Sequence, residues 1–265
     1  MKNKKYLGQH WLNNRAILDE IAGFSAGYEK GNLNKKPEKS YAPQFEEICL
    51  EIGPGLGTLT SSLFKYFDKI IAVEFDQKLA ENLPKSFPGK NLEVINGDIL
   101  DFDFNLIKTP YVVAGNIPYY ITSPIIEKLL TLRNKPERIV LLIQKEVAER
   151  ITDKKETLLS LLVKNRAEVE LGPVVLKNEF TPPPKVDSQV IIFRPREPKI
   201  LEEVFELIKL GFSSPRKKLV HNLSRIKGRE EWLKIFDKLK IKDDARPGDL
   251  TLEDWQKLYY AYLGK

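Results

Sequence analysis

Short apolar segments alternate with helical segments from residue 45 onward, and this alternation constrains the fold more than any other feature of the chain. The apolar runs are EICLEI, KIIAVEF, LEVIN, YVVAGN and RIVLLI, and the helical segments around them are TLTSSLFKYF, QKLAENLPKSF, SPIIEKLLTL and KEVAERI. Such a βαβα pattern predicts a mostly parallel sheet with helices on both faces. Two later runs, AEVELGPVVLK and SQVIIFRP, predict a terminal strand pair in which one member can be antiparallel. We therefore expect an α/β domain.

The pattern changes after Pro195 and Pro198. The segments ILEEVFELIKLGF, EEWLKIFDKLK and LTLEDWQKLYYAYL have the apolar spacing of amphipathic helices. We expect an N-terminal arm plus the α/β domain over residues 1–198, and a small all-α domain that binds RNA over residues 199–265. Residues 25–44 are rich in Gly, Asn, Lys and Pro, which predicts a long surface loop.

The composition is that of an ordinary globular protein. The chain has 265 residues, of which 42% are hydrophobic and 30% charged, and no apolar run approaches the ~20 residues that span a bilayer. The basic start has no apolar segment behind it, so we expect no secretory signal. The single cysteine, Cys49, lies in an apolar run, which fits a reducing cytoplasm and excludes a cysteine-based zinc site. His10 and His221 are far apart in sequence, so we expect no metal site. Because no apolar run is long enough for a membrane and no secretory signal is expected, we also expect no membrane association and a cytoplasmic location.

The charge of the chain favours a polyanionic partner. The formal net charge is +6 and the sequence pI is about 9.1. Residues 211–229 contain six basic side chains and no acid. Within them, Arg216, Lys217 and Lys218 are candidate contacts to RNA phosphates, and the alternative is a solvated helix face.

A glycine-rich turn follows the first strand-like run, in EIGPGLGTLT. Glycines at Gly53 and Gly55 allow a sharp turn and let a ligand approach the main chain, so both are candidate cofactor contacts. The G-x-G-x-G spacing departs from the pyrophosphate-binding fingerprint, and no Lys-Ser/Thr pair follows as in a P-loop. Glu51 would repel a phosphate and suits a ligand that carries positive charge.

Acidic residues follow the next two strand-like runs. Glu74, in VEFD, is placed to accept both hydroxyls of a ribose. Asp98, in NGDIL, can accept a hydrogen bond from an adenine amino group, with Ile99 against the ring. For both acids the alternative is helix capping. Ribose, adenine and a cationic group together describe S-adenosyl-L-methionine better than NAD or ATP.

The segment GNIPYY places an amide, a proline and two tyrosines where a buried strand ends. The side-chain oxygen of Asn116 and the carbonyl of Ile117 can accept the hydrogens of an adenine amine, which frees the nitrogen lone pair for reaction. Pro118 stiffens the turn, and Tyr119 offers a flat face to a base removed from its stack. The alternative is a strand-terminating turn whose tyrosines pack on the core.

A second aromatic turn, NEFTPPPKVDSQV, precedes the last strand-like run. Its three consecutive prolines hold an extended loop, so Phe180 can lie opposite Tyr119 and sandwich a base. Lys185 can reach a phosphate. The alternative for Phe180 is core packing.

These motifs, in this order, resemble the KsgA (RsmA) family of small-subunit ribosomal RNA adenine dimethyltransferases. The resemblance rests on GQHWL, EIGPGLGTLT, VEFD, NGDIL, GNIPYY, QKEVAERI, FTPPPKVDS, FSSPRKKL and ARPGDLTLEDW. It implies a Rossmann-like class I methyltransferase domain that uses S-adenosyl-L-methionine, followed by a helical domain. It also implies dimethylation of the N6 amines of two adjacent adenosines in the 3′-terminal hairpin loop of 16S rRNA, during assembly of the small subunit. The partner is then the rRNA or the assembling subunit, and a monomer is the default.

The resemblance also assigns positions of this chain to the cofactor and to the target base. On the cofactor it places Gln9, His10 and Leu12 of the N-terminal arm, Gly53, Glu74 and Asp98. Asn116 falls between cofactor and target amine, and Tyr119 and Phe180 match the base-stacking aromatics. His10 stands where many bacterial members have Asn, and Trp11 where Phe is usual.

Two other functions compete with this one. The macrolide-resistance methyltransferases modify an adenine of large-subunit rRNA with a similar catalytic domain, but FSSPRKKL and ARPGDLTLEDW resemble the KsgA side. A non-catalytic RNA-binding assembly factor would keep the fold without the chemistry, and the intact Gly, Glu, Asp and Asn-Ile-Pro-Tyr positions disfavour it.

Overall fold

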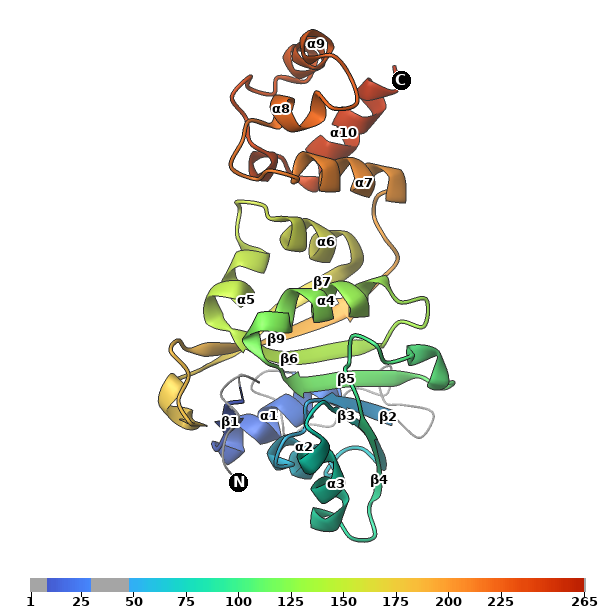
Figure 1. Ribbon diagram of the computed structural model, residues 1–265, viewed down its shortest axis with the longest axis vertical. Helices are drawn as coiled ribbons and strands as arrows, with labels where there is room; N and C mark the ends of the chain where they lie inside the picture. The colour runs from blue at the N-terminus through green and yellow to red at the C-terminus, as the bar shows by residue number, and fades with distance from the viewer. Residues whose placement is uncertain (1–8, 30–47, 265) are drawn as a thin grey trace. The chain divides into compact units, whose positions relative to one another are not determined.

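The computed structural model describes residues 9–29 and 48–264 (Figure 1). Residues 30–44, most of the loop predicted over 25–44, lie outside the described residues. The chain divides into two compact units, one within Met1–Ala148 and Val169–Pro195, the other within Glu149–Glu168 and Arg196–Lys265. Each unit has a core of its own.

The first unit is built on a seven-stranded sheet in the order β4-β3-β2-β5-β6-β9-β7. Its strands are β2 (Ile48–Ile52), β3 (Lys69–Glu74), β4 (Asn91–Asn96), β5 (Tyr111–Asn116), β6 (Arg138–Gln144), β7 (Ala167–Val175) and β9 (Ser188–Pro195). The strands from β2 to β6 are parallel, and β9 runs antiparallel to β6. The predicted Rossmann-like α/β class is therefore confirmed, including an antiparallel member near the end.

The order of the strands positions a ligand site. From the central β2 the chain runs outward through β3 to β4, and then returns to β5 on the other side of β2. At such a switch point the connections diverge and leave a crevice beyond the carboxyl ends of the strands. The residues that follow β2, β3, β4 and β5 thus meet at one edge of the sheet.

Helices cover the sheet where its central strands β2, β5 and β6 are buried along their length. The helical segments are α1 (Arg15–Ser25), α2 (Thr58–Leu63), α3 (Gln77–Asn82), η2 (Leu83–Ser86), η3 (Phe104–Leu106), η4 (Tyr119–Ile121), α4 (Thr122–Thr131), α5 (Lys145–Thr152) and η5 (Lys177–Glu179). Val112 and Ala114 of β5 share one core cluster with residues of α1 and α2, while Val113, which points to the other face, is equally buried. Such continuous burial is typical of a strand between two helical layers.

A two-stranded ribbon joins the N-terminal arm to the segment before β9. In it, β1 (Trp11–Leu12) pairs antiparallel with β8 (Phe180–Thr181). The backbone N–H of Asn13 donates to the Glu179 carbonyl at 2.9 Å, and the Asn13 side chain donates from Nδ2 to Thr181 Oγ1 at 2.6 Å. Nothing in the local sequence pattern predicts this pairing.

The second unit is helical. Its elements are α6 (Leu158–Arg166), α7 (Glu202–Gly211), α8 (Leu219–Leu223), α9 (Arg229–Leu239), η6 (Pro247–Asp249) and α10 (Leu252–Tyr262). Trp232, Phe236 and Trp255 are fully buried in its core.

Residues 149–168 belong to this helical unit, whereas the sequence analysis assigned them to the first domain. Hydrogen bonds to the segment that starts at Arg196 hold residues 149–168 in the helical unit. Asn165 Oδ1 accepts from the amides of Lys199 and Ile200 at 2.8 and 3.1 Å, and Arg196 Nη2 donates to the Lys164 carbonyl at 2.8 Å.

None of the helices within residues 9–29 and 48–264 has the length and apolar character that a membrane-spanning segment requires. The same residues bring no three His, Cys, Asp or Glu side chains together as a metal site.

Candidate active site

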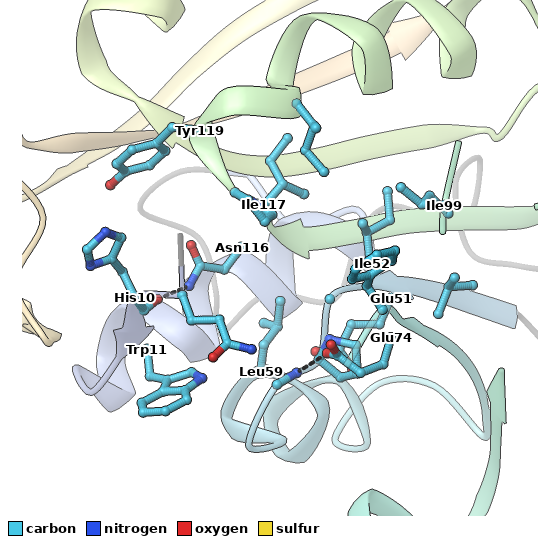
Figure 2. Close-up of a pocket in the computed structure, with 18 of the residues that line it drawn as sticks. His10, Trp11, Glu51, Ile52, Leu59, Glu74, Ile99, Asn116, Ile117 and Tyr119 are labelled. Atoms are coloured by element: carbon cyan, nitrogen blue, oxygen red, sulfur yellow. Dashed lines mark hydrogen bonds between the residues drawn. The ribbon is translucent and has the colours of Figure 1, made fainter. Parts of the chain in front are cut away.

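A cavity lies at the carboxyl ends of the four strands that flank the switch point (Figure 2). The empty space at this site, counted together with the open solvent at its mouth, is about 1140 Å³. Each strand end contributes to its lining: Ile52, Gly53 and Gly55 after β2, Glu74 and Phe75 after β3, Asp98 and Ile99 after β4, and Asn116, Ile117, Pro118 and Tyr119 after β5. The arm adds Gln9, His10 and Trp11. Most residues predicted to hold a cofactor or a base are thus brought together.

A hydrogen bond joins the glycine turn to the Glu74 side chain. Glu74 Oε2 accepts from the Gly55 amide at 3.0 Å, and Oε1 accepts from the Asp76 amide at 2.8 Å. Burial raises the pKa of the Glu74 carboxyl, although the two amides oppose that shift. Gly55 has a φ of +59°, and an added Cβ would lie 3.0 Å from Trp11 Nε1. Glycine is therefore required here both by the backbone and by the close approach of the arm.

Glu51 is a buried acid at the floor of the same cavity. Its Oε2 accepts from Thr60 Oγ1 at 2.6 Å, while its buried Oε1 has no hydrogen-bond partner. Burial, reinforced by the nearby charge of Glu74, raises the pKa of the Glu51 carboxyl to about 8. An unsatisfied acceptor of this kind fits a ligand that brings a positive charge, such as the ammonium group of an amino acid.

Asp98 and Ile99 line the cavity beside an aromatic ring that the sequence analysis missed. Asp98 Oδ1 accepts from the Leu100 backbone N–H at 2.9 Å, so the carboxylate stabilises the turn in which Asp98 lies. Ile99 is buried, while Phe75 is 61% exposed and lines the same cavity. A large aromatic residue directly after the strand-ending Glu74 is the sequence signal that would have identified it.

Asn116 is held by the N-terminal arm. Its Nδ2 donates to the His10 carbonyl at 2.9 Å, which leaves Oδ1 as the acceptor at the cavity (Figure 2). The next residue, Ile117, lines the cavity, and Pro118 with φ −59° and ψ 135° leads into η4. The turn thus presents one amide oxygen from a fixed position.

Tyr119 is anchored at its hydroxyl, which lies 2.7 Å from Ser188 Oγ of β9. Burial raises the pKa of the Tyr119 phenol, so it stays protonated. Its ring faces that of His10, with ring centroids 5.9 Å apart and planes at 22° (Figure 2).

Two of the residues predicted to contact the cofactor or the target base do not line this cavity. Leu12 is fully buried in the core, because alternation along β1 points Trp11 to the cavity and Leu12 away from it. Phe180, the partner of Leu12 in the ribbon, is 3% exposed and lies in the same core cluster. Phe180 is thus packed in the core of this structure, as its core-packing alternative describes, and its expected base sandwich with Tyr119 stays a prediction.

Comparison with known proteins identifies the family. The family model described as "Ribosomal RNA adenine dimethylase" matches residues 1–262. The chain belongs to the ribosomal RNA adenine dimethylase family. A relative of this dimethylase in Nostoc sp., named "Ribosomal RNA small subunit methyltransferase A", is 37% identical over an alignment of 282 positions that covers 97% of each protein.

Solved structures agree on the fold of the dimethylase. A dimethyladenosine transferase from Plasmodium falciparum aligns with a TM-score of 0.74 and 28% identity over 96% of this chain and 98% of that one. The 23S rRNA methyltransferase ErmE aligns with a TM-score of 0.70 and 26% identity over 94% of this chain and 98% of that one. The fold is therefore shared with a protein named as a dimethyladenosine transferase and with one named as a 23S rRNA methyltransferase.

The basic residues predicted to bind RNA are all exposed in the dimethylase. Lys185 lies in the loop before β9 of the first unit. Arg216, Lys217 and Lys218 lie between α7 and α8 of the second unit. Buried Asn222 supports that turn, since its Nδ2 donates to the carbonyls of Gly211 and Ser214.

Proposed function

We propose that this dimethylase transfers methyl groups from S-adenosyl-L-methionine to the N6 amines of two adjacent adenosines in the 3′-terminal hairpin loop of 16S rRNA. The choice of the small-subunit RNA is supported by the relative named for it, which matches nearly the whole chain. The chemistry is supported above all by one observation: Asn116 presents its Oδ1 to the cavity while its Nδ2 is occupied by the arm.

The cavity fits the methyl donor. Glu51 offers a buried, unpartnered oxygen to the donor's ammonium group, and Glu74 offers carboxylate oxygens to its ribose. Asp98 accepts from the adenine amine, and the ring lies between Ile99 and Phe75. When bound, S-adenosyl-L-methionine supplies an electrophilic methyl group.

The remaining task of the protein is to prepare the adenine amine. This amine is a poor nucleophile because its lone pair is delocalised into the ring. Asn116 Oδ1 and the Ile117 carbonyl accept its two hydrogens, which favours a tetrahedral nitrogen with an available lone pair. Tyr119 supports the base from its ring face. Each transfer replaces one N–H bond of the amine by an N–CH3 bond and leaves the spent donor as a neutral thioether. The released proton passes to water, so positioned acceptors suffice and no strong base is required.

The basic residues complete the proposal. Lys185 and the turn of Arg216, Lys217 and Lys218 contact phosphates and hold the RNA while one adenosine enters the cavity. The protein acts as a monomer on the rRNA of the assembling small subunit, in the cytoplasm.

The test is mass spectrometry of rRNA from unmethylated small subunits incubated with the protein and S-adenosyl-L-methionine. We expect N6,N6-dimethyladenosine at the two adjacent adenosines of the 3′-terminal hairpin, and none with Asn116→Ala. Large-subunit RNA is the control, because the fold is also that of ErmE. Methylation there alone would replace the small-subunit assignment, and RNA binding without methylation of either would favour an assembly factor.

A further inference from the structure

The cavity at the carboxyl ends of the strands is acidic, although the chain as a whole is basic. The net charge is +6, yet the lining contains Glu51, Glu74 and Asp98 (Figure 2). Within the part of the chain that the structure describes, no lysine or arginine lines this cavity. A cationic ligand therefore meets opposite charge here and no basic side chain of the lining.

Glu51 has a carboxyl oxygen that no described residue binds. Its Oε2 accepts from Thr60 Oγ1 at 2.6 Å, whereas Oε1 is buried and has no hydrogen-bond partner among the described residues. Glu74, by contrast, accepts from the backbone N–H groups of Gly55 and Asp76 with its two oxygens. Glu51 is also only 1% exposed. A buried carboxylate with one hydrogen bond is costly, so such a group holds a proton instead.

The elements beside Glu51 bring no basic partner to it from the described residues. The segment TLTSSL of α2 has no charged side chain, and YVVAGN of β5 has only Tyr111 as a titratable group, at its far end. Glu74 of β3 adds a negative charge, while Lys69 lies at the opposite end of that strand and pairs with Glu93. Elsewhere in the lining the titratable residues are His10, Asp98, Tyr119 and Tyr120. Burial first, and then the charge of Glu74, raises the pKa of the Glu51 carboxyl to about 8.

We propose that Glu51 is protonated in the donor-free protein and gives up this proton when its carboxylate receives the ammonium group of S-adenosyl-L-methionine. The inference rests on the proposed function and deepens it, because it couples donor binding to the release of a proton. The O–H bond of the carboxyl breaks, the proton passes to water, and the carboxylate forms an ion pair with the ammonium group. No covalent bond to the donor is made. Oε1 thereby gains the partner that the described residues do not supply.

This exchange makes the affinity for the donor depend on pH in a defined window. The pKa of Glu51 is about 8 before the donor binds, so below that pH the donor competes with a proton. The affinity should therefore rise by about tenfold per pH unit between about pH 5 and about pH 7. Above about pH 8 the rise should end, because α-amino groups lose their own proton there.

Isothermal titration calorimetry counts the proton when donor binding is measured in phosphate and in Tris, two buffers that take up protons with different enthalpies. At about pH 7 we expect wild type to release close to one proton per donor bound, since about nine tenths of Glu51 is protonated one unit below its pKa. Glu51→Gln offers an oxygen without an acidic proton, so it should release none and its affinity should stay nearly constant with pH. Thr60→Val removes a hydrogen bond that lowers the Glu51 pKa, so its proton release should persist to higher pH.

The matched ligand is 5′-methylthioadenosine, which keeps the adenine, the ribose and a thioether but lacks the ammonium group. It should bind without releasing a proton. A proton that leaves Glu74 or Asp98 would appear with both ligands, since both carry the ribose and the adenine. This comparison uses wild type alone, so it decides the question even where a variant fails to fold.

Three results would overturn the proton exchange: no dependence on the buffer in wild type, equal release by Glu51→Gln, or equal release with 5′-methylthioadenosine. A wild type that binds the donor without releasing a proton and still methylates small-subunit rRNA would remove this inference alone. A wild type that binds no donor would remove the proposed function as well.

Discussion

Asn116 uses the two ends of its amide for different tasks. Nδ2 donates to the His10 carbonyl of the arm, and Oδ1 remains as an acceptor at the cavity. The arm thereby fixes the orientation of this acceptor, and under the proposed function this is the preorganisation that makes such groups effective in catalysis.

Asn116→Ala should lower kcat by about 10²-fold or more, the usual loss for one preorganised hydrogen-bonding group. The affinity for RNA should change little, because phosphate contacts supply most of it. Single-turnover methylation and filter binding measure the two separately. Asn116→Asp is the matched variant, since it keeps an oxygen acceptor but cannot donate to His10. Near-normal turnover by the Ala variant would contradict the role of Oδ1.

Glu51, in the lining of the cavity, makes the stability of the protein depend on pH. Its pKa is raised by burial from 4.5 to about 8, so the folded protein binds a proton that the unfolded chain releases between these pH values. The contribution of Glu51 to the free energy of unfolding is thus fully present below pH 4.5 and is lost as the pH rises through 8.

Glu51→Gln, which cannot ionise, should remove this loss. Relative to wild type, the variant should become progressively more stable from pH 5 to pH 9, by a few kcal/mol at most, since one pKa unit corresponds to about 1.4 kcal/mol. Urea unfolding across this range measures the difference. If the difference in unfolding free energy between the two proteins did not change with pH, Glu51 would have the same pKa in the folded and unfolded states.

The start of α2 depends on a glycine at its N-cap, in the turn that lines the donor site. Gly57 has a φ of +82°, and an added Cβ would lie 2.8 Å from Phe87 Cε2 and 2.9 Å from Leu83 Cδ1. Gly89 has a similar φ of +74° but no heavy atom within 4 Å of an added Cβ. The two positions differ in packing and share the backbone strain.

Gly57→Ala should therefore destabilise the protein more than Gly89→Ala. Each change costs about 1–2 kcal/mol for a left-handed backbone, and overpacking at Gly57 adds about 1–3 kcal/mol. Thermal and urea unfolding of the two variants give the comparison. Equal losses would mean that Phe87 and Leu83 move aside without cost.

Elements that are specified by a pattern of neighbouring residues could be predicted from the sequence. The strands were recognisable from apolar runs, and Glu74, Asp98 and Asn116 were placed together because parallel strands end at one edge of a sheet. The contact of His10 with Tyr119 could not be predicted, and the sequence left open whether Phe180 packs in the core or stacks on a base. Both depend on the ribbon of β1 and β8, whose two-residue strands are too short to show a periodicity. Residues 149–168 were misplaced for a similar reason, since distant hydrogen bonds assign them to the helical unit.

The whole molecule carries a net charge of +6, and the basic turn between α7 and α8 concentrates part of it. Replacing Arg216, Lys217 and Lys218 by Ala should weaken RNA binding and reduce the slope of log K against log salt by about 2 to 3, one counterion release per lost phosphate contact. Replacing the exposed Lys234, Lys238 and Lys242 of the same unit changes the net charge equally and serves as the control. Identical slopes for the two triple variants would indicate a general charge effect and no specific contact.

The ribbon of β1 and β8 also determines how much of the chain must be synthesised before the N-terminal arm can dock. The His10 side chain is anchored to a residue 172 positions later in the chain, and the Asn13 side chain to one 168 positions later. Contacts of such sequence separation close large loops and form late in folding. A nascent chain can therefore build β2 to β6 before the arm has a partner. Only after residue 182 has left the ribosome can the arm dock and hold Asn116, so an unfinished copy has most of the sheet but no fixed Asn116 side chain.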